Sequence, residues 1–137
     1  MKKKPAGYYT NRHSCFLLQY HMVLVTKFRH PVIKGEIELF FKEYTESYFR
    51  ERELPILAME TMQDHVHILF EAPPQIRLDE LVNAYKSATS RHIRKNFPEQ
   101  LKPYYWKPFF WSQSYFIGSV SERTTSVVTR YIQTQKE

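Results

Sequence analysis

Two periods of apolar residues run along the chain, and they predict its secondary structure. Stretches rich in β-branched and aromatic residues indicate strands, whereas apolar residues spaced three and four apart indicate helices. The patterns predict this order of elements: a strand at 16–26, a helix at 36–53, a strand at 56–61, a tight turn at 62–64 leading into a strand at 63–70, a helix at 78–97, a loop at 98–111, a strand at 113–120 and a helix at 124–135.

The first predicted helix carries a stripe of apolar side chains along one face. Its members follow i, i+3, i+4, i+7, i+11 spacing: Ile37, Phe40, Phe41, Tyr44 and Tyr48. In a globular protein such a stripe normally faces the core. We therefore expect it to be buried packing rather than a binding surface.

The order strand–helix–strand–strand–helix–strand, with an extra helix at the end, predicts an α+β fold. It is the split βαβ order of a ferredoxin-like or RRM-like antiparallel sheet with helices on one face. In that topology the first and third strands are central neighbours. The sequence contains no repeat and no sign of a second domain, so we expect residues 1–137 to form one domain, with 1–12 as a flexible basic arm.

Charge and composition narrow the class of protein. The formal net charge is +6 and the isoelectric point about 9.4, which favours an anionic partner such as nucleic acid. Apolar runs fall short of the roughly 20 residues that span a bilayer, and the basic N-terminus is not followed by the apolar region of a signal peptide. Cys15 is the single cysteine and lies beside Phe16 and Leu17. We expect a reduced, packed thiol in a cytoplasmic, nucleoid-associated protein.

His65-Val66-His67 is the strongest candidate for a chemical site. Residues two apart on a strand project from the same face, so both imidazoles can stand side by side while Val66 faces the core. Two imidazoles on a rigid strand can hold one divalent metal ion. Two surface histidines on a half-exposed strand are the alternative. The predicted topology places the pair on a central strand, in the middle of the open face of the sheet.

The last predicted helix supplies residues that would complete such a site. Tyr131 and Gln135 are four apart and therefore share one face of the helix. The amide oxygen of Gln135 is suited to a hard divalent ion such as Mg²⁺ or Mn²⁺. A tyrosine hydroxyl can attack a DNA phosphodiester and keep the bond energy in a covalent phosphotyrosine. A tyrosine that packs or faces solvent is the alternative for Tyr131 taken alone.

Five blocks of sequence, in order and at matching spacing, resemble one family. The chain is similar to the small single-tyrosine HUH transposases (TnpA type) of bacterial and archaeal insertion sequences, from about residue 12 to residue 135. The blocks are residues 12–14 with 20–23 and 26–32, the histidine block 62–67, the basic stretch 85–91, the stretch 111–116 and the tyrosine helix 131–135.

The resemblance implies a homodimeric enzyme that cleaves and rejoins single-stranded DNA at the ends of a mobile element and recognises hairpins near those ends. It implies that Tyr131 is the nucleophile, giving a 5′-phosphotyrosine, and that His65, His67 and Gln135 bind Mg²⁺ or Mn²⁺. Many members have a Gly-Gly pair before the tyrosine helix, whereas residues 119–123 here contain no glycine. In such enzymes the tyrosine helix often reaches across to the partner subunit, so both arrangements stay open for Tyr131. A connector without glycine puts the movement of the helix in doubt and leaves the expected cleavage unchanged.

The remaining basic and aromatic residues have two interpretations each. Six basic residues are predicted to contact DNA phosphates: Arg12, Lys27, Arg29, Lys86, Arg91 and Arg94. The alternative is that they form a solvated surface. Four aromatic residues could stack on bases: Tyr104, Tyr105, Trp106 and Trp111. The alternative is that their loop packs on the core.

Two alternatives to the transposase remain at this point. A domesticated relative that acts on dispersed palindromic repeats would carry the same residues, although such relatives tend to be longer. A non-catalytic hairpin-binding protein would keep the fold and the basic face but would be expected to lose Tyr131, His65, His67 or Gln135. All four are present here.

Overall fold

The computed structural model describes residues 2–3, 7–121 and 124–135, with the side chains of 7–121 and 126–135. Its elements, in chain order, are β1 (Lys2–Lys3), β2 (Tyr9–Thr10), β3 (Cys15–Phe16), β4 (Gln19–Val25), the 3₁₀ turn η1 (Lys27–Arg29), α1 (Gly35–Glu51), β5 (Ile56–Thr61), β6 (His65–Glu71), α2 (Leu78–Asn96), α3 (Pro98–Leu101), β7 (Phe116–Ser119) and α4 (Thr124–Thr134).

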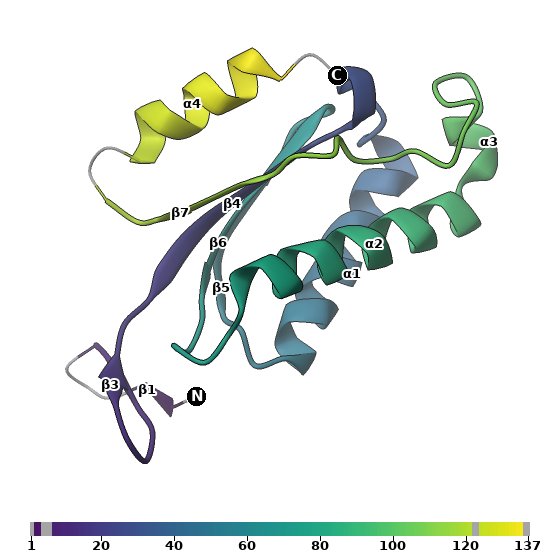
Figure 1. The fold of residues 1–137 in the computed structure, drawn as a ribbon. Coiled ribbons are helices and arrows are strands. Elements are labelled where there is room, and N and C mark those ends of the chain that lie inside the picture. Colours follow the sequence, from purple (N-terminus) through teal and green to yellow (C-terminus); the bar gives the residue numbers. More distant parts are fainter. Residues whose placement is uncertain (1, 4–6, 122–123, 136–137) are drawn as a thin grey trace.

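The main sheet is antiparallel and has the strand order β5-β6-β4-β7. The first long strand and the histidine strand are therefore central neighbours, and the predicted α+β class is confirmed. Helices α1 and α2 cover one face of the sheet, and α4 lies on the other (Figure 1). Among the described residues, no helix is long and apolar enough to cross a bilayer.

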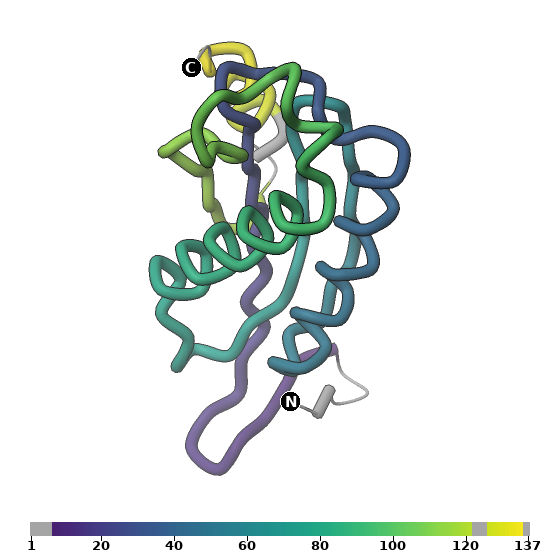
Figure 2. The backbone as a smooth tube through the Cα atoms, turned by 90° about the vertical axis from the view of Figure 1, so that its right-hand side faces the viewer, coloured from purple at the N-terminus to yellow at the C-terminus, as the bar shows by residue number. Residues whose placement is uncertain are grey.

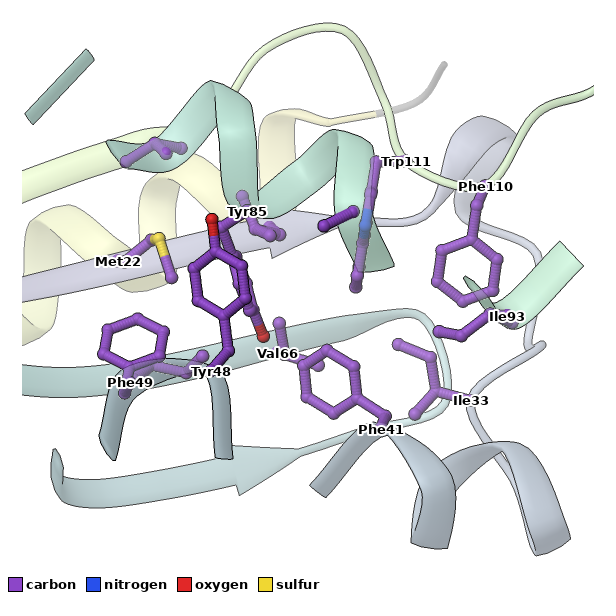
Figure 3. Packing of buried hydrophobic residues seen from close by; sticks show 14 of the residues in the cluster. Met22, Ile33, Phe41, Tyr48, Phe49, Val66, Tyr85, Ile93, Phe110 and Trp111 are labelled. Carbon is purple, nitrogen blue, oxygen red and sulfur yellow. The ribbon is translucent and has the colours of Figure 1, made fainter. Parts of the chain in front are cut away.

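The core lies between the sheet and the pair α1 and α2. Even-numbered residues of the central strands, such as Met22 and Val66, point into it and meet aromatic side chains from the helices (Figure 3). The predicted stripe on α1 is core: Ile37, Phe41 and Tyr48 are buried, while Phe40 and Tyr44 are partly buried against the same cluster. Acidic residues in the first turn of α2 and basic ones in its last turn complement the helix dipole.

Three predicted elements differ from the structure. The expected strand at 16–26 is two strands, because Cys15 and Phe16 pair with β2 in a small sheet while Gln19–Val25 pair with β6 and β7. The expected loop at 98–111 begins with the short helix α3, which has a proline in its first turn. The last strand, β7, covers Phe116–Ser119 and is shorter than the predicted strand at 113–120.

The prediction of a packed cysteine thiol is wrong. Cys15 is exposed, whereas its neighbour Phe16 is buried. Side chains alternate between the faces of a strand, so the burial of Phe16 directs Cys15 outward.

The N-terminal segment forms a small sheet of order β1-β2-β3, which extends past one end of the main sheet (Figure 2). A buried polar contact ties it to the main sheet. The Tyr9 hydroxyl donates to Oε1 of Glu71 at 2.5 Å, and Gln19 donates to Oε2 of the same carboxylate. Burial, with the Glu71 carboxylate beside it, raises the pKa of Tyr9 to about 12. Flexibility of 1–12 stays a prediction.

Candidate active site

The two histidines of β6 lie on the face of the sheet that α4 covers. His65 pairs with Val25 and His67 with Val23, so all four side chains share that face. Val23 and Val25 are fully buried because Val128 of α4 packs on them, with Tyr131 beside it. We expected an open face here. The two valines explain the difference, since apolar side chains on that face gain by being covered.

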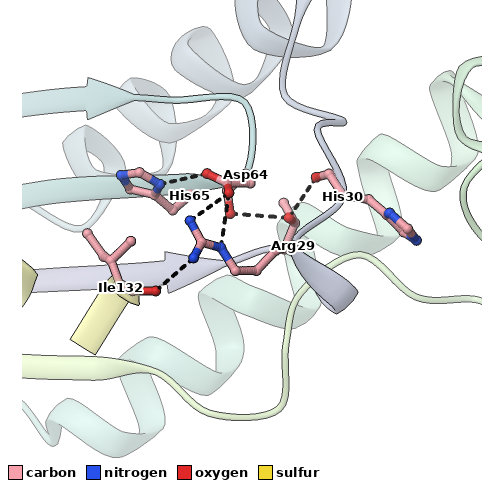
Figure 4. Close-up of polar contacts among 6 residues, drawn as sticks. Arg29, His30, Asp64, His65 and Ile132 are labelled. Carbon is pink, nitrogen blue, oxygen red and sulfur yellow. Dashed lines mark hydrogen bonds and ion pairs between the residues drawn. The ribbon is translucent and has the colours of Figure 1, made fainter. Parts of the chain in front are cut away.

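His65 is held by a carboxylate at the start of its own strand. Its Nδ1 lies 2.8 Å from Oδ1 of Asp64 (Figure 4). A carboxylate only accepts, so Nδ1 carries the proton and Nε2 keeps a lone pair. Burial would raise the pKa of Asp64, but hydrogen bonds from His65 and Arg29 outweigh it and lower that pKa. A carboxylate–histidine pair of this kind orients imidazoles at metal centres.

Arg29 joins this pair to the last helix. Its Nε and Nη2 both bond to Oδ2 of Asp64, at 3.0 and 2.8 Å, and its Nη1 donates to the carbonyl of Ile132 at 3.1 Å (Figure 4). The Ile132 carbonyl belongs to the last turn of α4, where backbone acceptors have few partners within the helix, and it also accepts from the backbone N–H of Gln135 at 3.3 Å. One guanidinium therefore connects the His65 support to the tyrosine helix.

His67 has a third histidine as its neighbour. Its Nε2 lies 2.5 Å from Nδ1 of His21, which comes from β4. Burial lowers the pKa of both imidazoles, and for His67 the nearby His21 lowers it further. Both rings therefore favour the neutral form, which is the form that can bind a metal. A metal at Nε2 of His67 would have to replace the hydrogen bond to His21.

Tyr131 and Gln135 meet at one hydroxyl. Ser114 Oγ lies 2.9 Å from the Tyr131 hydroxyl and donates to Oε1 of Gln135 at 3.0 Å. Serine has one proton to give, so the Tyr131 hydroxyl is the donor in its own bond to Ser114. The predicted sharing of a face by these two residues is confirmed in this sense, although α4 ends at Thr134 and Gln135 is the next residue.

Two further features hold this corner of the site. The amino group of Lys86 donates to the carbonyls of Ser112 and Gln113, at 2.8 and 2.9 Å, directly before Ser114. Gly118 on β7 leaves room for the ring of Phe116, which an added Cβ would approach to 2.9 Å. The Phe116 ring in turn lies 5.6 Å from the ring of Tyr131, measured between centroids.

The donor set fits a divalent metal ion. Nε2 of His65 is left with a lone pair, His67 shares its face, and Oε1 of Gln135 can accept from Ser114 and still coordinate through its second lone pair. Imidazole nitrogen together with amide oxygen suits Mn²⁺, and the oxygen suits Mg²⁺. Within the described ranges, no cluster of three or more His, Cys, Asp and Glu side chains has the arrangement of a metal site, so the amide is the candidate third ligand.

The predicted phosphate contacts separate into two groups. Arg91 and Arg94 line a groove of about 350 Å³ between α2 and residues 108–113, and Arg12 is exposed. Arg94 also donates to Oγ of Ser90 at 3.1 Å. The other three side chains have partners outside this groove or among aromatic rings and backbone carbonyls. Lys86 bonds to the carbonyls before Ser114, Arg29 to Asp64, and Lys27 contacts aromatic rings. The DNA-binding role of all six stays a prediction.

Sequence reasoning did not give a role to Asp64, His21, Ser114 or Gly118. His21, Asp64 and Ser114 lie within the blocks quoted above, and Asp64 directly precedes His65; that position was the available signal. The contacts of His21 and Ser114 join strands and helices far apart in the chain, so no local pattern displays them.

Comparison with known proteins identifies the family of the chain. Residues 14–135 match the family model described as "Transposase IS200 like". The chain belongs to the IS200-like transposase family. It is 35% identical to the ISDra2 transposase TnpA of Deinococcus radiodurans, over 98% of this chain and 91% of that protein. It is 26% identical to a transposase for insertion sequence element IS200 of Salmonella typhimurium, over 91% of this chain and 81% of that protein.

The fold agrees as well. A crystal structure of a candidate transposase from Deinococcus radiodurans R1 superposes with a TM-score of 0.85 at 32% identity, and the match covers 93% of this chain and 97% of the other. Transposases cleave and transfer DNA strands. The family thus sets the class of reaction, and the geometry above bears on how this chain performs it.

Proposed function

We propose that this chain cleaves and rejoins single-stranded DNA at insertion-sequence ends through a 5′-phosphotyrosine on Tyr131. The observation that carries the proposal is the convergence of the Tyr131 hydroxyl and the Gln135 amide on Ser114, on the face of the sheet that bears His65 and His67. The proposal therefore assigns Tyr131, Gln135 and the two histidines of β6 to one site, because α4 lies on the face of the sheet that bears the histidines.

In the proposed step the Tyr131 oxygen attacks the scissile phosphorus. The bond between phosphorus and Tyr131 forms as the bond to the 3′ oxygen breaks; the tyrosine hydroxyl loses its proton and the 3′ oxygen gains one. Free tyrosine has a pKa near 10 and is a weak nucleophile at neutral pH. Mg²⁺ or Mn²⁺ bound by His65, His67 and Gln135 would withdraw charge from the phosphate.

The residues of the chain itself orient the reactants. Ser114 fixes the phenol oxygen, Asp64 fixes the ring of His65, and Arg29 keeps the last turn of α4 beside them. The reverse reaction, in which a 3′-hydroxyl attacks the phosphotyrosine, needs the same placement. We further propose that the DNA carries hairpins near the cleavage site and that the protein acts as a homodimer, as the resemblance implies.

The test is covalent capture of a single-stranded element end. Tyr131→Phe is expected to abolish the protein–DNA adduct on a denaturing gel and to leave hairpin binding intact, because only the attacking oxygen is removed. Tyr115→Phe, a half-buried tyrosine of the adjoining segment, is the matched control and should retain the adduct. An adduct formed by Tyr131→Phe would contradict the assignment.

The metal role has its own measurement. His65→Ala and His67→Ala are expected to lose Mg²⁺- or Mn²⁺-dependent adduct formation, and a chelator should do the same to the native protein. Direct Mn²⁺ binding, followed by its paramagnetic signal, should weaken in both variants. Undiminished Mn²⁺ binding would remove these histidines from the ligand set.

A further inference from the structure

Two exposed aromatic side chains, Phe28 and Trp106, meet the half-buried Phe109 beside the turn that follows β4. We use the name aromatic platform for Phe28, Trp106 and Phe109 with the lysines Lys27 and Lys107. Trp106 is 75% exposed and Phe28 is 43% exposed, which is unusual for large apolar side chains of a chain whose other rings are mostly buried. The platform is therefore a surface feature that core packing does not explain.

The fold builds this surface from two segments. Phe28 lies in η1 with a positive φ of 58°, a conformation rare for a bulky residue. The turn is fixed on both sides, because the backbone N–H of Lys27 donates to Phe110 and the Tyr105 hydroxyl donates to the carbonyl of Lys27, each at 2.8 Å. The platform is thus held in place rather than carried by a loose loop.

The rings of the platform touch without covering one another. Phe28 meets Phe109 at 90° and 5.8 Å between centroids, and Trp106 meets Phe109 at 81° and 6.1 Å. Edge-to-face contacts of this kind hold rings in position and do not bury them as parallel stacks would. Most of the Trp106 surface remains open to a flat ligand.

Positive charge accompanies the rings. The Lys27 amino group lies 5.3 Å from the Phe28 centroid and 5.2 Å from that of Phe109, and Lys107 lies 4.6 Å from the centroid of Trp106. Within the part of the chain that the structure describes, neither lysine forms an ion pair with a carboxylate. Flat rings interleaved with uncompensated cations match the chemistry of single-stranded nucleic acid, whose bases stack and whose phosphates are anionic.

The platform adjoins the candidate active site. Phe28 directly precedes Arg29, whose guanidinium bonds to Asp64, the residue that holds His65. The short turn η1 therefore contributes the Phe28 ring to the platform and the Arg29 guanidinium to Asp64, which holds the candidate metal ligand His65. The same guanidinium donates to the carbonyl of Ile132, the residue after Tyr131, so the turn also contacts the tyrosine helix.

We propose that the aromatic platform binds the bases of single-stranded DNA that flank the cleaved phosphodiester. Bases stack on Trp106 and Phe28, and Lys27 and Lys107 contact the adjoining phosphates. This proposal rests on the proposed function, because the ligand of the platform is the single-stranded DNA substrate proposed there. Stacking tolerates any base, so the platform adds affinity for unpaired DNA without reading its sequence.

The two tryptophans of the chain allow a direct test. Trp106 is exposed, whereas Trp111 is 7% exposed and donates to Thr89, so a ligand on the platform should quench only the first. The probe is a hairpin-free oligothymidylate, and the protein is the Tyr131→Phe variant, which cannot form an adduct under the proposed function. Quenching of the native tryptophan emission is expected, and it should be absent when Trp106→Phe is added.

Affinity for labelled oligothymidylate gives the second readout. Trp106→Ala is expected to raise the dissociation constant about tenfold, with Tyr8→Ala, an exposed ring on the N-terminal segment, as the unchanged control. An oligonucleotide of abasic sites should bind the native and Trp106→Ala proteins equally, because it keeps the phosphates and lacks the rings. Equal affinity of the native protein for both oligonucleotides would overturn the proposal.

The outcomes separate this proposal from the one it rests on. If oligothymidylate does not quench Trp106 while the native protein still forms the Tyr131-dependent adduct, the platform proposal is wrong and the proposed function stands. If Trp106 is quenched but the native protein forms no adduct, the proposed cleavage chemistry is wrong and the platform proposal stands. If Trp106→Ala alters self-association by light scattering and leaves DNA affinity unchanged, the surface is a protein interface and the proposal fails.

Discussion

At the scale of single residues, the site depends on small polar groups that hold larger ones. Ser114 joins the Tyr131 hydroxyl to Gln135, Asp64 fixes the tautomer of His65, and His21 contacts His67. Each supporting residue lies beside a candidate catalytic residue or metal ligand. Loss of such a hydrogen bond should misplace the residue it holds and leave the rest of the fold intact.

Ser114→Ala tests this at the nucleophile. We expect adduct formation to slow about fivefold, since removing one positioning hydrogen bond is worth about 1 kcal/mol. Hairpin affinity should stay unchanged, because the proposed role of Ser114 is in placing Tyr131 rather than in binding DNA. The measurement is the single-turnover rate of adduct formation at saturating DNA. Ser114→Thr keeps the hydroxyl and should recover most of the rate; a native rate in Ser114→Ala would rule out the positioning role.

At the scale of elements, α4 is attached to the sheet by an apolar contact and a polar one. Val128 packs on Val23 and Val25, and Arg29 donates to the carbonyl of Ile132. The cation also lies at the C-terminal end of the helix, where the helix dipole favours positive charge. In this arrangement the helix packs on β4 of its own chain, so any exchange of α4 between subunits would have to break both contacts.

Arg29→Lys keeps the charge but not the planar fork, and one amino group cannot reproduce the three bonds to Asp64 and Ile132. We expect amide hydrogen exchange in residues 128–134 to speed up about tenfold and adduct formation to fall, with hairpin affinity nearly unchanged. Arg130→Ala, an exposed arginine on the same helix, is the matched control. If Arg29→Lys weakens DNA binding and leaves exchange as in the native protein, Arg29 contacts phosphate instead, as its sequence context predicted.

The hydrogen bonds that the Asp64 carboxylate accepts from His65 and Arg29 also give a dependence of stability on pH. The pKa of Asp64 is lowered in the folded protein, so its contribution is fully present above the ordinary carboxyl value near 4 and is lost as pH falls below it. Urea unfolding between pH 6 and pH 3 should therefore show a steeper loss of stability for the native protein than for Asp64→Asn. If the free energy of unfolding falls equally with pH in both proteins, the hydrogen bonds of the Asp64 carboxylate add no stability.

At the scale of the whole molecule, positive charge is divided between the two faces of the sheet. The groove with Arg91 and Arg94 lies along α2, on the core side, whereas the candidate active site lies under α4. Lys86 links them, since it comes from α2 and holds the backbone that leads to Ser114. Burial lowers the pKa of Lys86, which agrees with a structural bond rather than a solvated charge.

A salt titration distinguishes binding charges from structural ones. If Arg91 and Arg94 each neutralise one phosphate, the double variant Arg91→Ala/Arg94→Ala should reduce the slope of log affinity against log salt by about 1.4 to 1.8. Arg77→Ala, whose side chain is paired with Asp79 and Glu80 at the other end of α2, should not change it. An unchanged slope in the double variant would assign both arginines to a solvated surface.

The sequence by itself determined the fold class, most element positions and the family. Periodicity is a local property, so α1, α2 and the hairpin of β5 and β6 were predicted from it, and the two-residue spacing placed His65 and His67 on one face. The spacing of Tyr131 and Gln135 likewise predicted that they converge. The inferences from periodicity and spacing need only neighbouring residues, whereas the family rests on five blocks that lie between residues 12 and 135.

The tertiary structure alone decided how these parts meet. It placed α4 over the histidine face, gave Ser114, His21 and Arg29 their partners, and separated exposed Trp106 from buried Tyr105 and Trp111. These contacts join residues 17 to 103 positions apart, as between Ser114 and Tyr131 or between Arg29 and Ile132. The physical reason is that burial and hydrogen bonding depend on which elements pack together, and one residue's local pattern is the same whichever partner it meets.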